Sequence, residues 1–182
     1  NISDLSITWE KCTMRSWLNG YDSSSNSYGR DYTKFNFINT AFTSSERSAI
    51  KTTEVVNDNN IRYSTAGGND TSDKVFLLSE NEVYNSSTAL SYGFVKGRDA
   101  DDESRRCKSS TFAKAMGAHS AINSSYAGNC SWWLRSPGDG TCNAAGVAIS
   151  GHVNNGGLVY HVNIAVRPAL HLDLSSSDLY SY

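Results

Sequence analysis

The apolar positions in the first half of the chain follow helical spacing and predict short helices separated by polar loops. Within residues 9–19, two tryptophans, a methionine and a leucine recur at roughly helical intervals. Gly20 follows them, so we expect one helix that ends there. Residues 20–34 are rich in serine and include two glycines, which predicts an exposed loop.

Local capping patterns predict three further helices. A Ser or Thr followed three residues later by Glu forms a capping box, and this pattern occurs at 43–46 and 79–82. We therefore expect helices over residues 44–52 and near 80–85. Residues 109–118 predict another helix, with a serine cap and a glycine at its end.

In the last third of the chain, helical spacing gives way to short apolar runs and turn residues. Residues 131–136 predict a strand, which the Pro-Gly-Asp-Gly sequence at 137–140 ends. Apolar residues alternate with small or polar ones over 145–149, which predicts a half-buried strand. The sequences SGH at 150–152 and NNGG at 154–157 are typical of hairpin turns.

Two more segments complete the expected sheet. Residues 74–79 follow the polar loop 57–73 and predict a short buried strand. Alternation over 165–174 predicts another strand, in which Pro168 marks an edge or a bulge. Helices followed by a hairpin-rich antiparallel sheet predict an α+β fold in a single domain over residues 1–182.

Composition narrows the class of protein. The 182 residues are 38% hydrophobic, 19% charged and 11% aromatic, with a formal net charge of −2. This charge argues against a nucleic-acid binder, and the aromatic content against a disordered chain. No apolar run reaches the ~20 residues of a membrane span, so we expect no direct membrane insertion. Residue 1 is Asn, so we expect a processed product or an excised fragment.

The sequence carries few signs of catalysis or of metal binding. It contains no nucleophile elbow, no P-loop, no dinucleotide-binding glycine motif and no H-E-x-x-H. The histidines at 119, 152, 161 and 171 are scattered. We therefore expect neither catalytic residues nor a metal or other cofactor.

The four cysteines leave their chemistry open. Cys12, Cys107, Cys130 and Cys142 include no C-x-x-C pair and have no histidine at zinc-finger spacing. Cys130 and Cys142 bracket a tight segment and either form a disulfide or remain free thiols in a reduced compartment.

An acidic cluster lies within residues 97–106. Asp99, Asp101, Asp102 and Glu103 are calcium-binding residue types, but their spacing does not match the EF-hand loop. We expect a solvated loop here.

Two tryptophans and two arginines interrupt the apolar strands. Trp132 and Trp133 either stack on a sugar or lie in the core, and we favour the core because neighbouring strand residues face opposite ways. Arg135 and Arg167 either bind an anion or anchor loops by hydrogen bonds. We favour anchoring, because a buried arginine must be paired.

Six segments together resemble a bacterial domain family of unknown function, found mainly in gut Firmicutes and their phages and marked by the motifs WWLRSPG and VRPAL. The segments are ITWEKCTMRSWLNG (7–20), FINTAFTSSERSAI (37–50), DKVFLLSENEVY (73–84), SSTFAKAMGA (109–118), WWLRSPG (132–138) and VRPALHLDL (166–174). The resemblance spans nearly the whole chain, with an extra serine-rich insertion at 21–35. The strand-rich segment that family members usually carry before TWE is absent.

The LRS and VRP signatures at 134–136 and 166–168 also resemble the two arginine-bearing motifs of the formylglycine-generating-enzyme branch of C-type-lectin folds. This resemblance implies a C-type-lectin-like fold. Cys130 and Cys142 do not match the catalytic cysteine pattern of that enzyme, and the calcium-sugar signatures of animal lectins are absent. The resemblance therefore implies a binding scaffold without enzymatic activity.

Variable proteins of diversity-generating retroelements use the same fold. Randomised adenines in their template cannot produce Lys, Glu, Gln, Met or Trp at a diversified Asn codon. Residues 139–166, between the two fixed motifs, contain none of these five types. A Gly-, Asn- and Val-rich hairpin explains this by composition alone, but we favour diversification.

This interpretation assigns two sets of residues. The expected fixed skeleton is Ala144, Ala145, Val147, Gly151, Val153, Gly157 and Val159. The expected ligand contacts are Gly146, Ala148, Ser150, His152, Asn154, Asn155, Leu158, Tyr160, His161, Asn163 and Ile164. Tyrosine and histidine give large rigid contacts, while serine, asparagine and glycine give adaptable ones.

We therefore expect a non-enzymatic binding domain that presents residues 139–165 to a protein or glycan on another cell or host surface. It would be displayed on a bacterial surface or a phage particle, with its oligomeric state left open. Two alternatives remain. One is a formylglycine-generating-enzyme-like thiol enzyme or relic that uses Cys130 and Cys142, and the other is a structural cell-surface module without a specific ligand.

Overall fold

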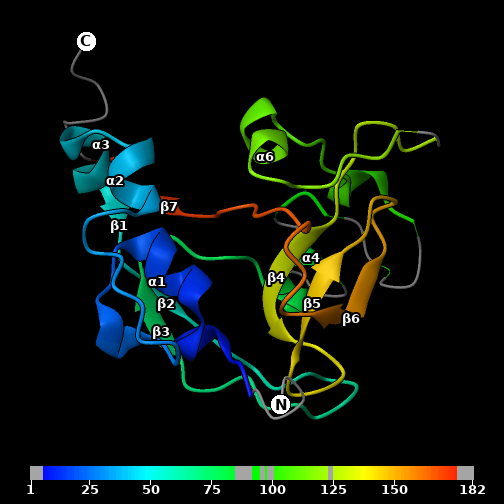
Figure 1. The fold of residues 1–182 in the computed structure, drawn as a ribbon, viewed down its shortest axis with the longest axis horizontal. Helices are drawn as coiled ribbons and strands as arrows, with labels where there is room; N and C mark the ends of the chain where they lie inside the picture. The colour runs from blue at the N-terminus through cyan, green and yellow to red at the C-terminus, as the bar shows by residue number, and fades with distance from the viewer. Residues whose placement is uncertain (1–5, 85–91, 95–96, 98–100, 123–124, 176–182) are drawn as a thin grey trace.

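Short helices and small antiparallel sheets make up the chain (Figure 1), and this confirms the α+β class. The computed structural model describes residues 6–84, 92–94, 97, 101–122 and 125–175. Its helices are α1 (Thr13–Asn19), α2 (Phe37–Ala41), α3 (Ser44–Ala49), α4 (Glu80–Val83) and α6 (Thr111–Ala115), with 3-10 turns η2 (Trp9–Lys11), η3 (Ser23–Ser25) and η4 (Glu103–Arg105). Its strands are β1 (Ile50–Lys51), β2 (Thr53–Val55), β3 (Thr71–Asp73), β4 (Trp132–Pro137), β5 (Asn143–Val147), β6 (Val153–Leu158) and β7 (His171–Leu172).

The largest sheet joins β4, β5 and β6 in sequence order, with β5 in the centre and every pair antiparallel. Two small ribbons, β1 with β7 and β2 with β3, lie beside the N-terminal helices (Figure 1). The β1–β7 pair brings the C-terminal part of the described chain back to the end of α3. This pair therefore ties the two halves of the sequence together.

Strand β4 separates two apolar cores. Trp132 lies in the core beneath the large sheet and is fully buried, while Trp133 lies in the core of the N-terminal helices. Neighbouring side chains on a strand point to opposite faces, so one strand serves both cores. The prediction that both tryptophans are core residues is confirmed.

The capping patterns predicted helix starts well and helix ends less well. Both capping boxes are present, at Thr43 with Glu46 and at Ser79 with Glu82. The predicted helix over 9–19 is divided, because Cys12 is extended and its sulfur accepts a hydrogen bond from the Arg15 amide. Gly20 ends α1 in a left-handed conformation, as expected.

Two predicted helices changed in extent. The helix expected over 44–52 ends at Ala49, because Ile50 and Lys51 pair with β7 instead. The helix at 109–118 is shorter than expected and runs from Thr111 to Ala115, with Ser110 as its cap. Helix α2 was not predicted, although the Asn36 side chain caps it by accepting from the Asn39 amide.

Two strand predictions and one turn prediction were wrong. Residues 74–79 are largely buried but bend at 74 and 75, and within them only Phe76 forms a bridge, with Ala169. Residues 165–174 pair only at β7 and at two isolated bridges, because this segment crosses from one core to the other. The NNGG sequence at 154–157 lies inside β6, where Gly157 allows the Trp133 ring to approach.

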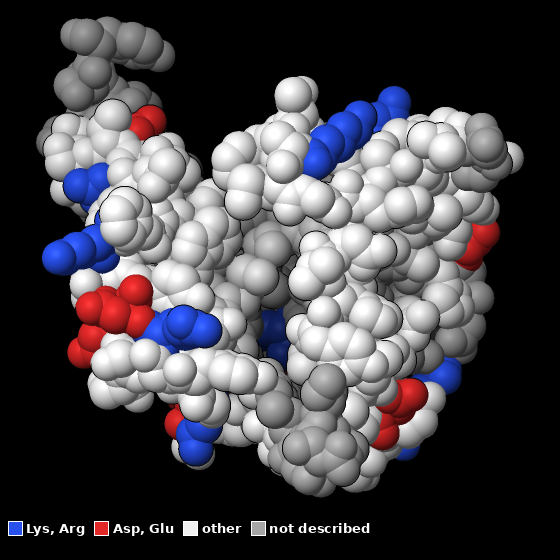
Figure 2. All heavy atoms as spheres, in the orientation of Figure 1, with Lys and Arg blue, Asp and Glu red and all other residues white. Residues whose placement is uncertain are grey.

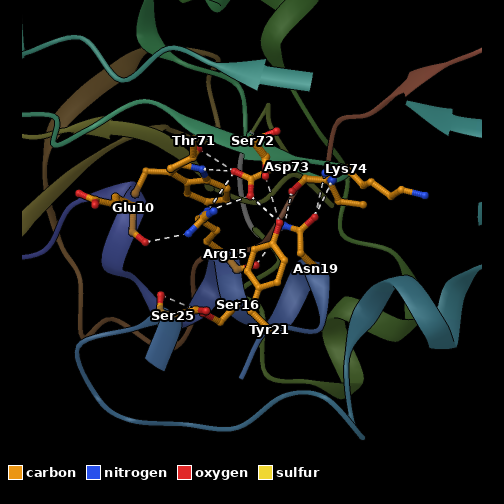
Figure 3. A network of polar contacts seen from close by, with 12 residues as sticks. Glu10, Arg15, Ser16, Asn19, Tyr21, Ser25, Thr71, Ser72, Asp73 and Lys74 are labelled. Carbon is orange, nitrogen blue, oxygen red and sulfur yellow. Dashed lines mark hydrogen bonds and ion pairs between the residues drawn. The ribbon is translucent and has the colours of Figure 1, made fainter. Parts of the chain in front are cut away.

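Ion pairing and hydrogen bonds hold α1 against β3 (Figure 3). The fully buried carboxylate of Asp73 forms an ion pair with Arg15 at 2.8 Å. It also accepts hydrogen bonds from the Trp9 indole at 3.1 Å, the Tyr21 hydroxyl at 3.0 Å and the Thr71 hydroxyl at 2.7 Å. This network fixes the position of Trp9, which helps to form the cavity described below.

The charged segment at 97–106 is not simply a solvated loop. Arg105 is fully buried and donates to the carbonyls of Gly151 at 2.7 Å and Gly97 at 2.6 Å. Asp102 pairs with it at 3.2 Å. A buried guanidinium has five donors to satisfy, and these backbone carbonyls supply acceptors. Asp99 and the tail beyond residue 175 lie outside the described residues.

Candidate binding cavity

An apolar cavity of about 390 Å³ lies between the N-terminal segment and the three-stranded sheet. Figure 2 shows a hollow near the centre of the view, between these two parts of the molecule. The described residues that line the cavity are Ile7, Thr8, Trp9, Cys12, Thr13, Met14, Tyr28, Leu77, Trp133, Leu134, Arg135, Ser136, Pro137, Ala144, Val159 and Tyr160. This volume and this mostly apolar, aromatic wall are typical of ligand pockets.

The arginine in the cavity wall has no free hydrogen-bond donor. Arg135 donates from Nε and Nη2 to the Val56 carbonyl, and from Nη1 to the Leu77 carbonyl at 2.8 Å. Both terminal nitrogens also donate to the carboxylate of Glu82. These five bonds use all five guanidinium donors. The prediction that Arg135 is an anchor is confirmed, and an anion could bind here only by displacing one of its partners.

The other polar groups of the wall are uncharged. Burial raises the pKa of the Cys12 thiol to about 11, so this side chain remains a neutral thiol at physiological pH. The remaining polar side chains are hydroxyls of threonine, serine and tyrosine. Because Glu82 neutralises Arg135, the cavity fits an uncharged, largely apolar group better than an ion.

The rim of the cavity includes part of the segment expected to bind ligand. Val159 and Tyr160 follow β6 and line the opening, and Tyr160 is 50% exposed. The main chain holds this rim in place, because the Val159 amide donates to the Cys142 carbonyl at 3.1 Å. The Ile7 amide donates to the Thr141 carbonyl at 3.0 Å, which ties the N-terminal segment to the same turn.

The expected contact residues differ in their exposure. Exposed positions are Asn154, Tyr160, His161 and Asn163. Half-buried positions are Gly146, Ala148, Ser150, His152, Leu158 and Ile164. Of the expected skeleton, Ala145, Val147, Gly151 and Val153 are buried, while Ala144, Gly157 and Val159 are half-buried. Alternation along β5 and β6 accounts for this division, since successive side chains face opposite sides of the sheet.

Two of the expected contact positions are poorly placed for ligand. Asn155 is buried, and its side-chain amide has no hydrogen-bond partner among the described residues. A Cβ atom at Gly146 would lie 3.1 Å from the Trp132 carbonyl oxygen, so a larger residue there needs a local shift. The surface available to a ligand is therefore narrower than the sequence suggested.

Sequence reasoning missed most of the cavity. Trp9, Met14 and Tyr28 come from the first 30 residues, whereas the sheet supplies Trp133 and Tyr160. No local pattern signals this meeting, because the two groups are more than 100 positions apart. Val162 was assigned to neither set, yet it is 89% exposed beside the expected contacts.

Arg167 behaves differently from Arg135. Its guanidinium lies 4.9 Å from the ring centre of Trp132 and 5.8 Å from that of Phe94. The two aromatic faces partly stabilise the positive charge of this guanidinium through cation–π contacts. Its buried Nη1 has no hydrogen-bond partner within the described ranges, so hydrogen bonding does not explain this side chain.

The histidines and cysteines do not form the sites that the sequence left open. Among the described residues, no group of three or more His, Cys, Asp or Glu side chains could hold a metal ion. All four cysteines are free. Cys130 precedes β4, and Cys142 lies beyond its other end, next to β5. A six-residue strand spans roughly 20 Å, so these two sulfurs cannot form a disulfide.

The fold and the cavity together define an α+β domain with a ligand-sized apolar site. Residues 2–174 match the family described as "Domain of unknown function (DUF6273)", and the chain belongs to this family. No curated protein and no solved structure matches the chain. Within the described ranges, no helix has the length and apolar character needed to cross a bilayer.

Proposed function

We propose that the chain is a non-enzymatic ligand-binding domain whose site is the apolar cavity and its rim at Val159 and Tyr160. The observation that carries this proposal is a cavity with tryptophan, methionine and tyrosine side chains in its wall and no free charged group among the described residues. Its ligand is an uncharged apolar group, such as an apolar side chain or the face of a sugar ring, carried by a protein or glycan on another cell or host surface.

The resemblance of the LRS and VRP motifs extends the proposal to a C-type-lectin-like scaffold, in which the two motif arginines are structural. Arg135 joins β4 to residues 56, 77 and 82, and Arg167 packs on the tryptophan that begins β4. Both therefore hold the sheet that carries the rim. In this proposal the domain is displayed on a bacterial surface or a phage particle.

Binding assays with two matched tyrosine variants test the proposal. Tyr160 and Tyr63 are each 50% exposed, but only Tyr160 lines the cavity. The protein is applied to arrays of glycans and of surface peptides, and the Kd of the strongest binder is then measured for Tyr160→Ser and Tyr63→Ser. We expect Tyr160→Ser to weaken binding about tenfold or more, which corresponds to about 1.4 kcal/mol, and Tyr63→Ser to leave it unchanged.

Equal effects of the two tyrosine variants would contradict a site at the rim. A structural module without a ligand predicts that changes at His152, Tyr160 and His161 alter neither binding nor stability, since surface changes usually stay within ~0.5 kcal/mol. The positions of Cys130 and Cys142 at opposite ends of β4 give no support to a thiol enzyme built on those two residues.

Within this proposal, residues 139–166 form a diversified region. Its support is the absence of Lys, Glu, Gln, Met and Trp, together with the exposure of Asn154, Tyr160, His161 and Asn163. Sequencing of the encoding locus tests it. A near-copy of these codons that differs at adenines, beside a reverse-transcriptase gene, is the expected result. Its absence would remove diversification and leave the binding site standing.

A further inference from the structure

Cys107 and Cys130 face each other across a short antiparallel pairing. Lys108 and Asn129 form an antiparallel bridge, which places Cys107 directly opposite Cys130. The Cys130 amide donates to the Cys107 carbonyl at 2.8 Å, and the Ser109 amide donates to the Gly128 carbonyl at 3.0 Å. In this register, opposite Cα atoms lie about 5.5 Å apart. That separation falls within the range that a disulfide spans.

The surroundings of the pair favour a reactive thiolate. A hydrogen bond from the Cys107 thiol is the main cause that lowers the pKa of Cys130, and Ser109 and the neighbouring charge of His119 act in the same direction. The same hydrogen bond raises the pKa of Cys107, while the Arg167 guanidinium opposes this rise. Arg167 thus places its partly unpaired positive charge near the Cys107 sulfur. Positive charge near a cysteine stabilises its thiolate.

Access to the pair comes from one side. Cys130 is buried in the core beneath the large sheet, and Cys107 packs against the same core but remains half-buried. A small oxidant therefore reaches Cys107 more easily, with Cys130 placed behind it. This arrangement suits a two-step exchange in which one thiol is attacked from solvent and the other completes the bond.

We propose that Cys107 and Cys130 form a redox-active dithiol site that small disulfides, such as oxidised glutathione, convert to an intramolecular disulfide. In the first step the Cys130 thiolate takes the proton of the Cys107 thiol, and the Cys107 thiolate that this leaves attacks one sulfur of the small disulfide and expels one thiolate. Cys130 then gives its proton to that released thiolate, attacks the Cys107 sulfur of the mixed disulfide and expels the second thiolate. Two protein thiols are oxidised, one small disulfide is reduced to two thiols, and the two protein protons pass to the released thiolates.

The bond closes the segment between residues 107 and 130, which includes α6. Closing a loop in the unfolded chain stabilises the folded protein, so the oxidised form melts at a higher temperature than the reduced form. The site is separate from the apolar cavity, because neither cysteine lines it. The proposal therefore does not depend on the proposed function.

The experiment uses the native chain and a variant that keeps only this pair. Cys12→Ser with Cys142→Ser removes the other two thiols, and serine can still cap α1 at position 12. Both proteins are incubated with oxidised glutathione without denaturant, and thiol titration and peptide mass mapping follow. We expect the loss of both thiols, a mass lower by two hydrogen atoms in the double variant, and one linked peptide that joins Cys107 to Cys130.

Single changes Cys107→Ser and Cys130→Ser in the native chain are the controls, and neither should give this linked peptide. The proposal is overturned if both thiols of the double variant stay titratable, or if glutathione remains attached as a stable mixed disulfide. It is also overturned if native-chain mapping links Cys130 to Cys142, or if the bond joins two chains.

Discussion

Arg135 connects four segments of the chain through a single side chain. From β4 it contacts the carbonyls of Val56 and Leu77 and the carboxylate of Glu82 at the start of α4. Its side chain is 5% exposed and that of Glu82 is 18% exposed. Removing one partner of such a pair leaves the other charge buried without compensation.

Replacement of Arg135 by methionine therefore should cost about 3–5 kcal/mol of unfolding free energy. Arg30 is exposed and provides the control, since Arg30→Met should change stability by less than about 0.5 kcal/mol. Urea unfolding followed by tryptophan fluorescence measures both. Similar midpoints for the two variants would show that Arg135 does not anchor these segments.

Asp101 provides a pH-dependent contribution to stability. Hydrogen bonds from Ser150 and then Tyr126 lower the pKa of the Asp101 carboxyl, and the Tyr126 bond is 2.6 Å long. Because the pKa is lower in the folded protein than in the unfolded chain, this contribution is present above the unfolded-state pKa. It is lost as the pH falls through the folded-state pKa.

We therefore expect Asp101→Asn and Tyr126→Phe each to lower the urea midpoint at pH 7. Both differences from the native protein should shrink as the pH falls toward 3. Urea unfolding across this pH range measures the effect. A difference that stays constant with pH would exclude the Asp101 hydrogen bonds as its source.

At the scale of elements, the Asp73 network determines where α1 lies relative to β3. Arg15 from α1, Trp9 from η2 and Tyr21 from the following loop all meet the carboxylate of Asp73 (Figure 3). These three residues are more than 50 positions from Asp73 in the sequence. Helix α1 has only seven residues and therefore little surface for packing. The polar network holds it in place instead.

Asp73→Asn removes the charge that balances Arg15, and we expect it to cost about 3 kcal/mol. Asp58 is exposed, so Asp58→Asn should have almost no effect on stability. Thermal or urea unfolding compares the two variants. If they are equally stable, the buried ion pair is not what holds α1 in place.

The same elements show how much the sequence could predict. Helix starts at Thr43 and Ser79 were predictable, because a capping box involves residues only three positions apart. The burial of Arg105 was not predictable, since its acceptor at Gly151 is 46 positions away and no periodic pattern marks the contact. Segment 165–174 alternates like a strand, but it crosses between two cores and pairs only at a few positions.

For the whole molecule, the candidate site exists only because distant parts of the chain meet. Trp133 and Tyr160 come from the region that the sequence marked, but Trp9 and Met14 complete the wall from the other half. The sequence could therefore indicate the rim but not the cavity. The Cys107–Cys130 pairing was missed for the same reason, because it depends on a bridge between Lys108 and Asn129, which lie in two separate segments.

The central claim is that the cavity binds an uncharged apolar group, and a neutral fluorescent probe tests it most directly. N-Phenyl-1-naphthylamine is titrated into the native protein and into Ala144→Leu, which places a larger side chain in the cavity wall. Circular dichroism confirms that the variant is folded. Because Trp9 and Trp133 line the cavity, bound probe should quench tryptophan emission.

The account predicts saturable quenching with one probe per chain in the native protein, and a loss of affinity of tenfold or more in Ala144→Leu. Non-saturable quenching in the native protein would contradict the account, and so would unchanged affinity in the folded variant.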